Sequence, residues 1–297
     1  MTTDVIYHGD CIRGMAEQVE DDSVDLVIAD PPLYRGGKES AGTFPDREAY
    51  AAFSKGWIGE VSRVLRGGGS LCLFAPLELF CRLFPILEDS GLELHQQILI
   101  HKDLRDAAVG GKKAKAFPAA TDCLFLLSKD PRPFVSRFLK EKQLAKGYTP
   151  KEMNSLLGVH TNGGGMWSHY TGNLALGQIP TEKVWGKLEK ILGFDLPYHR
   201  ISRTFHPAEG LSSLWNDVKF REEKDRLHPA QKPRKLLTRL LCTCSDEGDL
   251  VLDPFMGIGS TAEACADLNR RYIGFELNQR YFQMATQRVE NRQLTLF

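Results

Sequence analysis

The stretch Asp253-Pro-Phe-Met-Gly-Ile-Gly-Ser-Thr261 decides the fold that this sequence predicts. A short apolar run over 249–252 precedes it, as expected for a buried parallel strand. The residues that follow, 262–268, are rich in helix formers. A strand, a glycine turn and a helix in this order bring backbone N–H groups against a ligand at the carboxyl end of the strand. We therefore predict an α/β protein with a ligand pocket at this turn.

A second acidic residue supports a nucleotide-like ligand at the glycine turn. Glu276 ends the next apolar run, at the distance where a ribose-binding carboxylate sits in nucleotide folds. The glycine spacing alone also fits the loose dinucleotide fingerprint, and a purely structural turn is the alternative. No Gly-Lys-Ser/Thr follows the turn, which excludes a phosphate-binding P-loop. A second site elsewhere in the sequence is needed to decide between these interpretations.

That second site is Asp30-Pro31-Pro32-Leu33-Tyr34, which follows directly on the apolar run 24–29. The two prolines fix φ and remove two backbone donors, so carbonyl acceptors are held beside the Asp30 carboxylate. A rigid cluster of acceptors suits an amino group, although an Asp-Pro-Pro turn in a loop is the plainer alternative. Asp10, just beyond the first predicted strand, is suited to bind a ligand, to cap the following helix, or to do both.

Composition and charge exclude several classes of protein. With 42% hydrophobic and 26% charged residues, the 297-residue chain has the composition of an ordinary globular protein. Its net charge is zero, so no overall field attracts nucleic acid or membranes. Residues 1–50 hold four Lys/Arg and eleven Asp/Glu, whereas 101–150 hold eleven and five. This basic middle predicts either a local polyanion contact or a solvated charged surface.

The cysteines and the N-terminus predict a cytoplasmic protein without a metal site. None of the seven cysteines forms a Cys-x-x-Cys pair, and Cys242-x-Cys244 has no histidine at zinc-finger spacing. They are typical of reduced thiols. The N-terminus lacks a basic-then-apolar signal, and no run approaches about 18 apolar residues.

The alternation of strands and helices predicts three segments: 1–130, an insertion over 131–226, and 227–297. In the first, a helix over 46–65 is expected to stop at Arg66-Gly67-Gly68-Gly69, and 105–117 is expected to form a mobile basic loop. Two capped helices, near 149–157 and 181–192, flank a glycine-rich turn in the insertion. They predict either a helical recognition unit or a satellite subdomain packed by its tryptophans.

Five separated motifs together resemble the S-adenosylmethionine-dependent DNA amino-methyltransferases. They are Gly9-Asp10, Asp30-Pro31-Pro32, His228-Pro-x-Gln-Lys232-Pro233, Asp253-Pro-Phe255-x-Gly257-x-Gly259 and Gly274-x-Glu276. The acceptor element comes first and the glycine element last, with an insertion between them. This permuted order is that of the β-class enzymes of bacterial and phage modification systems. The resemblance implies a doubly wound, Rossmann-like sheet with a mostly helical target-recognition insertion.

The resemblance also implies roles for individual residues. The residues expected to bind S-adenosylmethionine are Asp10, Lys232, Asp253, Phe255, Gly257, Gly259, Ser260, Thr261 and Glu276. Those expected to act on the flipped-out base are Asp30, Pro31, Pro32, Leu33 and Tyr34. The DNA contacts expected from the basic loop and the insertion are Lys112, Lys113, Lys115, Trp167 and His169. The expected partner is double-stranded DNA; the resemblance also allows a cognate restriction endonuclease and a homodimer.

The sequence departs from the family pattern at Leu33, where an aromatic residue usually stacks on the base. We expect Tyr34, or a ring from the insertion such as Trp167, to replace it. No cysteine follows a proline, which disfavours cytosine-C5 chemistry. In the family that the sequence resembles, enzymes that methylate cytosine N4 more often have Ser at this position, so the resemblance implies adenine N6 as the target of Asp30 rather than cytosine N4. A protein or small-molecule N-methyltransferase, an inactive DNA-binding relative and a nicotinamide dehydrogenase remain as alternatives, the last leaving Asp30-Pro31-Pro32 without a role.

Overall fold

The computed structural model describes residues 1–34, 44–102, 120–158, 165–172, 177–218 and 231–293. The chain divides into two compact units. The first, which we call the sheet unit, comprises residues 1–65, 69–128 and 204–297. The second, the helical unit, comprises 129–203 together with 66–68.

An eight-stranded sheet organises the chain. Its order is β1 (Val5–His8), β8 (Arg271–Glu276), β7 (Leu250–Asp253), β2 (Val24–Ala29), β3 (Leu65–Phe74), β5 (Thr121–Lys129), β4 (Leu92–His101) and β6 (Leu214–Trp215). The strands from β1 to β3 in this order are parallel, and β5 is antiparallel to β3. The two strands from the C-terminal end of the chain, β8 and β7, therefore lie between β1 and β2 from the N-terminal end.

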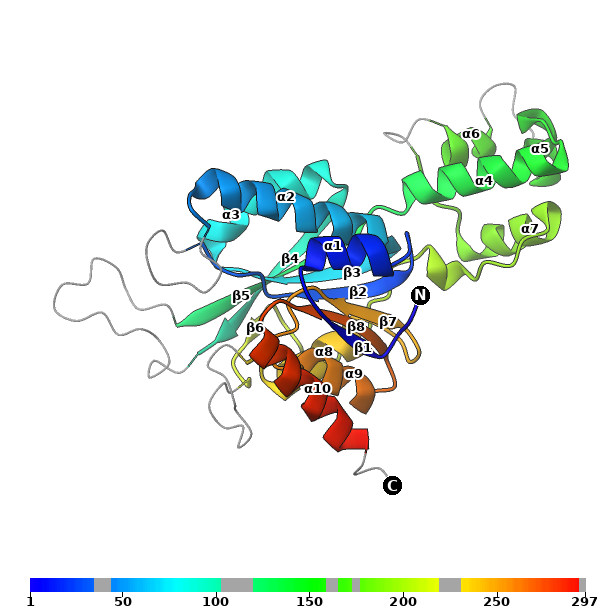
Figure 1. The fold of residues 1–297 in the computed structure, drawn as a ribbon. Helices are drawn as coiled ribbons and strands as arrows, with labels where there is room; N and C mark the ends of the chain where they lie inside the picture. Colours follow the sequence, from blue (N-terminus) through cyan, green and yellow to red (C-terminus); the bar gives the residue numbers. More distant parts are fainter. Residues whose placement is uncertain (35–43, 103–119, 159–164, 173–176, 219–230, 294–297) are drawn as a thin grey trace. The chain divides into compact units, whose positions relative to one another are not determined.

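Helices cover both faces of the sheet, as Figure 1 shows. On one face lie α1 (Cys11–Gln18), α2 (Arg47–Val64) and α3 (Leu77–Asp89); on the other lie α8 (Arg234–Cys244), α9 (Ser260–Asp267) and α10 (Gln279–Gln293). Side chains alternate along a strand, so Val27 joins the first core and its neighbours Leu26 and Ile28 join the second. The predicted doubly wound α/β fold is confirmed. Among the described residues no helix has the length and apolar character needed to cross a membrane.

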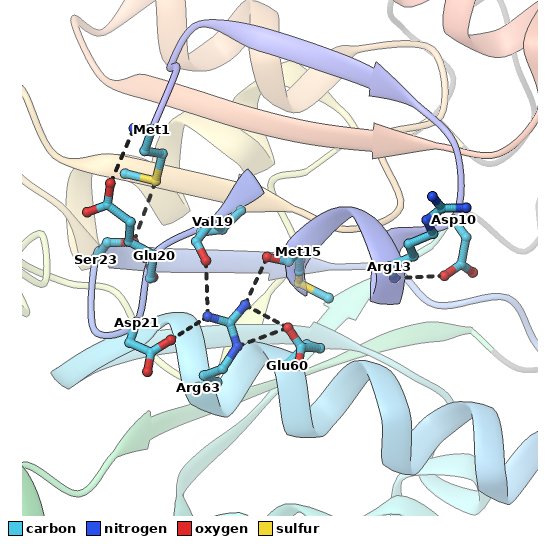
Figure 2. A network of polar contacts seen from close by, with 10 residues as sticks. All are labelled: Met1, Asp10, Arg13, Met15, Val19, Glu20, Asp21, Ser23, Glu60 and Arg63. Carbon is cyan, nitrogen blue, oxygen red and sulfur yellow. Dashed lines mark hydrogen bonds and ion pairs between the residues drawn. The ribbon is translucent and has the colours of Figure 1, made fainter. Parts of the chain in front are cut away.

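Arg63, near the C-terminal end of α2, binds the C-terminal end of α1 (Figure 2). Its guanidinium donates to the carbonyl oxygens of Met15 at 2.8 Å and Val19 at 3.0 Å, at the C-terminal end of α1. The carboxylates of Glu60 and Asp21 accept from the same group. Because the last carbonyls of a helix have no partner within it, Arg63 satisfies groups that would otherwise need water.

The helical unit has a small core of its own. It contains α4 (Arg132–Lys146), α5 (Pro150–Leu156), α6 (Met166–Thr171), α7 (Glu182–Leu192) and a single 3₁₀ turn, η2 (Tyr198–Arg200). Trp167 and Trp185, both 1% exposed, lie at the centre of this core. The Trp167 indole N–H donates to the Gln143 side chain at 2.8 Å, and that of Trp185 donates to the Leu196 carbonyl at 2.6 Å. Both interior indoles are thus satisfied.

Three features differ from the sequence expectation. Helices α4 and α6 were not predicted, and residues 204–218 belong to the sheet unit although they fall within the expected insertion 131–226. The glycines after Arg66 do not end α2 in a loop but continue as β3. Gly68 has φ +79°, and a Cβ there would lie 2.8 Å from the Ser202 carbonyl carbon. The glycine is explained by this close backbone approach rather than by a helix stop.

We expect Arg63→Ala to lower the free energy of unfolding by about 2 kcal/mol, because two helix-end carbonyls lose a charged donor. Thermal or urea unfolding measures the change. Arg13→Ala is the matched control, since the Arg13–Glu17 pair lies on the exposed face of α1 and should contribute little. Equal melting temperatures for the Arg63→Ala variant and the wild type would contradict a structural role for this residue.

Candidate functional site

Four adjacent parallel strands carry the predicted site at their carboxyl ends. Asp10 follows β1, Glu276 ends β8, Asp253 ends β7 and Asp30 follows β2. These strands are neighbours in the order β1-β8-β7-β2. The residues lie far apart in the sequence, yet the sheet brings all four carboxylates to one edge. In open α/β sheets this edge is where ligands bind.

The acceptor motif and the glycine turn meet because β2 pairs with β7. Leu26 lies opposite Val251 and Val27 opposite Leu252 in a parallel register. Beyond this pair, β2 ends two residues further along, at Ala29, and β7 ends one residue further along, at Asp253. Asp30 lies close enough to raise the pKa of Asp253. The structure therefore joins the two predicted half-sites into one.

The glycine turn uses backbone conformations that other residues rarely adopt. Gly257 has φ +57° and Gly259 has φ +84°. A Cβ on Gly259 would lie 2.9 Å from the Cα of Ala285, which leaves no room for a side chain. Gly259 precedes Ser260, the first residue of α9, so the turn delivers the N-terminus of this helix to the site. This is the arrangement that the sequence predicted for the ligand turn.

Glu276 is held by the turn that it faces. Its Oε2 accepts from the Gly257 N–H at 2.7 Å, and its Oε1 accepts from the Asn278 N–H at 2.7 Å. Burial raises the pKa of this carboxyl, while the Asn278 and Gly257 N–H groups act in the opposite direction. The side chain is therefore fixed in one orientation, as a carboxylate that binds ribose hydroxyls requires.

Asp253 is the most perturbed acid of the site. Its side chain is nearly inaccessible, and burial raises the pKa from 3.8 to about 7. The Thr261 hydroxyl and the Phe255 N–H, the latter donating to Oδ1 at 2.9 Å, act against this rise. The nearby Asp30 and Glu276 carboxylates add to it. The site thus carries an excess of negative charge that favours a cationic ligand.

Asp10 caps α1: its Oδ1 accepts from the Arg13 N–H at 3.0 Å. The capping interpretation is confirmed, and the cap fixes the carboxylate at the tip of β1. Gly9 donates its N–H to the Glu276 carbonyl at 3.0 Å, which keeps Asp10 beside the end of β8. A role in ligand binding remains compatible with this cap, as the sequence allowed.

Asp30 has a partner that the sequence did not reveal. The Lys232 ammonium lies 2.8 Å from Asp30 Oδ2 and 4.6 Å from the centre of the Phe74 ring. Lys232 is two residues before the start of α8. The resemblance assigned it to the cofactor, whereas the structure brings its charge to the acceptor motif. Neither local pattern nor spacing identifies a partner that far away in the chain.

An aromatic cluster connects the two half-sites on the α2 side. The Phe255 ring lies edge-on to Trp57 with ring centres 5.5 Å apart, and 6.2 Å from Phe53. The half-buried Tyr34 ring lies 5.9 Å from Tyr50, which is a further neighbour of Phe53. The rings of α2 stand at positions 50, 53 and 57. Spacings of three and four residues place side chains on one side of a helix, so the sequence pattern could have predicted this cluster.

The remaining predicted residues lie elsewhere or outside the described residues. Pro31 is buried, while Pro32 and Leu33 are partly exposed beside Asp30. His169 is exposed on α6 of the helical unit. Trp167, in contrast, is buried in the core of that unit, so both faces of its ring are covered. Lys112, Lys113 and Lys115 fall outside the described residues.

The chemistry of these groups fits S-adenosylmethionine better than an anionic dinucleotide. An oriented carboxylate at Glu276 suits ribose hydroxyls, and the helix N-terminus after Gly259 suits a carboxylate. The carboxyl groups of Asp10 and Asp253 at the adjacent strand ends suit a sulfonium cation and oppose a pyrophosphate, whereas the charge of Asp30 is balanced by Lys232. Among the described residues no group of three or more His, Cys, Asp or Glu side chains could hold a metal ion.

Comparison with known proteins agrees with this geometry. The family model N6_N4_Mtase, described as DNA methylase, matches residues 24–287. The chain belongs to this DNA methylase family. Among its relatives, the Type II methyltransferase M.HpaI of Haemophilus parainfluenzae is 26% identical over 279 residues, covering 93% of this chain and 71% of that protein. The family's methyl donor is S-adenosylmethionine.

Solved structures share the fold of this DNA methylase. The M1.HpyAVI–SAM complex has a TM-score of 0.58 at 17% identity, covering 96% of this chain and 98% of its own. The cytosine-N4-specific PvuII DNA methyltransferase has a TM-score of 0.55 at 16% identity, covering 97% and 86%. The family assignment removes the dehydrogenase and small-molecule alternatives, and it leaves the target base open.

We expect Asp253→Asn to change how the stability of this DNA methylase depends on pH. A folded pKa of about 7 means that the folded protein holds a proton that the unfolded chain releases near pH 4. The contribution of Asp253 to the free energy of unfolding is greatest below pH 4. It is lost as the pH rises through 7, and the loss is at most about 4 kcal/mol. Urea unfolding between pH 5 and 8 should show this loss in the wild type and not in the variant.

Asp217→Asn is the control for the pH experiment. The Arg239 and Lys235 side chains hold the pKa of Asp217 well below its usual range, so its titration lies outside the measured interval. This variant should keep the wild-type slope between pH 5 and 8. A wild-type slope in the Asp253→Asn variant would show instead that Asp253 is already ionised in the folded protein at pH 5.

Proposed function

We propose that this DNA methylase transfers a methyl group from S-adenosylmethionine to the N6 amino group of an adenine in double-stranded DNA. The observation that carries this proposal is the parallel pairing of β2 with β7, which sets Asp30 beside the turn that contains Phe255. A methyl donor bound at the end of β7 would then face Asp30 at the end of β2 across a gap that one base can fill. An acid at position 30 is the feature that favours adenine over cytosine N4.

The cofactor would lie along the ends of β1, β8 and β7. Glu276 would accept hydrogen bonds from the ribose hydroxyls, and Asp10 would bind further along the same edge. The Phe255 ring and the turn of Gly257 and Gly259 would shape the methionine end. The cofactor carboxylate would then meet the backbone of Ser260 and Thr261 at the N-terminus of α9.

The acceptor motif would prepare the amino group for attack. The nitrogen lone pair of a base amine is delocalised into the ring, which makes it a poor nucleophile. Asp30 and the Pro31 carbonyl would accept its two N–H groups and so favour a pyramidal nitrogen whose lone pair points towards the donor. When bound, S-adenosylmethionine supplies an electrophilic methyl group on a sulfonium, whose leaving sulfur keeps the electron pair.

The target base must leave the helix stack to reach such a site. Leu33 offers no ring at the usual stacking position, and the buried Trp167 ring is committed to its own core. Of the two rings that the sequence offered in place of Leu33, Tyr34 and Trp167, Tyr34 remains the candidate. Its contact with Tyr50 would hold the ring in one orientation and lower the entropic cost of stacking.

The helical part of 131–226 is our proposed target-recognition region. Residues 129–203 contain twelve Lys/Arg and six Asp/Glu, although the whole chain is neutral. A basic surface suits the phosphates of duplex DNA, and the exposed His169 is a candidate contact. The basic loop with Lys112, Lys113 and Lys115 is a second candidate. A homodimer and a cognate restriction endonuclease also stay within this proposal.

Incubation of the protein with labelled cofactor and unmethylated duplex DNA tests the proposed reaction. We expect N6-methyladenine as the product, and Asp30→Ala to lower turnover at least about 100-fold with little change in cofactor affinity. Asp246→Ala, an exposed acid paired with His206, is the control and should retain activity. Nucleoside analysis that finds N4-methylcytosine would overturn the adenine assignment. Cofactor binding without any methylated product would favour an inactive relative.

Tyr34→Ala tests the proposed stack on the flipped base. Loss of a stacked ring costs roughly 1–3 kcal/mol, so DNA affinity should fall by about 5- to 150-fold. Tyr34→Phe keeps the ring and is the matched control, with affinity close to that of the wild type. Fluorescence anisotropy with labelled duplex measures both. If Tyr34→Ala binds and methylates DNA as well as the wild type does, another group holds the base.

A further inference from the structure

The Asp30–Lys232 ion pair joins the acceptor motif to the segment that leads into α8. The ammonium is 2.8 Å from Oδ2, and only 17% of the lysine side chain is exposed. The same ammonium lies over the face of Phe74, at 4.6 Å from the ring centre. The lysine side chain is therefore mostly enclosed and its ammonium is held from two sides, whereas the Asp30 side chain is 38% exposed and open to a ligand.

The backbone that carries Lys232 is rigid. Pro233 follows it as the N-cap of α8, with φ −60°, and α8 is anchored by the buried side chains of Leu236, Leu237 and Leu240. A lysine on a flexible loop would lose much entropy in holding a carboxylate. Here the Phe74 ring and the start of the helix already restrict the side chain, so less is lost on pairing.

We propose that Lys232 is a positioning residue for Asp30. It binds Oδ2 and thereby orients the carboxylate, which leaves Oδ1 to accept from the amino group of the target base. The inference rests on the proposed function of Asp30, and it assigns Lys232 a task different from binding the cofactor. Without the ammonium, the Asp30 carboxylate can rotate, and the negative charges of Asp30 and Asp253 repel each other without compensation.

The position of the ammonium distinguishes this role from direct binding of the methyl donor. Lys232 contacts the acceptor side of the site, at the end of β2, and its second contact, Phe74, ends β3. The turn of Gly257 and Gly259 lies on the other side of β2, after β7. In the proposed reaction, the methylated amine gains positive charge on the same side of the site as the Lys232 ammonium. Asp30 separates these two positive charges only if its carboxylate keeps a fixed orientation.

Lys232→Gln tests the proposal in steady-state methylation of duplex DNA. We expect kcat to fall by about 10- to 100-fold, because a small displacement of an orienting group has effects of this size. The KM for S-adenosylmethionine and its Kd by calorimetry should stay within about threefold of the wild type. Lys232→Arg keeps the charge and should recover most of kcat. Lys235→Gln is the control. Lys235 lies on the surface of α8 beside Asp217, and this variant should behave as the wild type.

A double-mutant cycle with Asp30→Asn, measured in single turnovers, tests whether Lys232 acts through Asp30. In the Asp30→Asn background, Lys232→Gln should have no further effect on the methylation rate. Independent losses in the two backgrounds would overturn the proposal. A KM or Kd for the cofactor raised more than about tenfold at unchanged kcat would likewise assign Lys232 to the cofactor instead.

The two proposals fail in different ways. If the wild-type protein forms no methylated amine on DNA, the proposed function itself fails, whatever Lys232 does. If the wild type methylates DNA and Lys232→Gln is equally active, only the role of Lys232 is refuted. Circular dichroism of each variant and its cofactor Kd establish that a loss of rate does not come from unfolding.

Discussion

The parallel pairing of β2 with β7 is the constraint on which the site depends. Leu26, Val27, Val251 and Leu252 are fully buried, and they come from opposite ends of the chain. Their register decides that the acceptor turn and the glycine turn end at the same level. A one-residue shift along these strands would displace Asp30 relative to Asp253 and turn every side chain of the shifted strand to the other face. The packing of the buried strands, rather than the conformation of the loops, therefore sets the distance between the two turns.

Electrostatics follows from the same topology. Adjacent strands that all end in acids collect negative charge at one edge. Burial raises the pKa values of Asp253 and Glu276, and the nearby carboxylates of Asp30 and Glu276 raise that of Asp253 further. Such a cluster destabilises the empty site, and a sulfonium cation would relieve it. Lys232 balances the charge of Asp30 on the acceptor side alone, where a neutral amine would bind in the proposed reaction. The site is therefore divided into a part that favours a cation and a part whose charge is already balanced.

The sequence predicted what local pattern can encode. The turn at Gly257–Gly259, the strand that ends before Asp30 and the helix near 181–192 all followed from apolar runs, helix caps and glycine positions. Partners distant in the chain, such as Lys232 for Asp30 or Arg63 for α1, leave no periodic signal. For Trp167 the sequence allowed either a DNA contact or the core of a helical subdomain. The structure shows the core position, where Gln143 of α4, a helix that was not predicted, accepts from the indole N–H.

Charge is divided between the two units in a way that the neutral total conceals. The helical unit, residues 129–203, holds twelve of the 38 basic but only six of the 38 acidic residues, so the rest of the chain is acidic by six charges. Uniformly acidic surfaces repel DNA, and a uniformly basic site would repel a sulfonium. Separation into a basic unit and an acidic strand edge would suit both proposed ligands within one chain. If DNA binds through the basic unit, salt should weaken that binding, while a cofactor beside the buried Asp253 should be screened less.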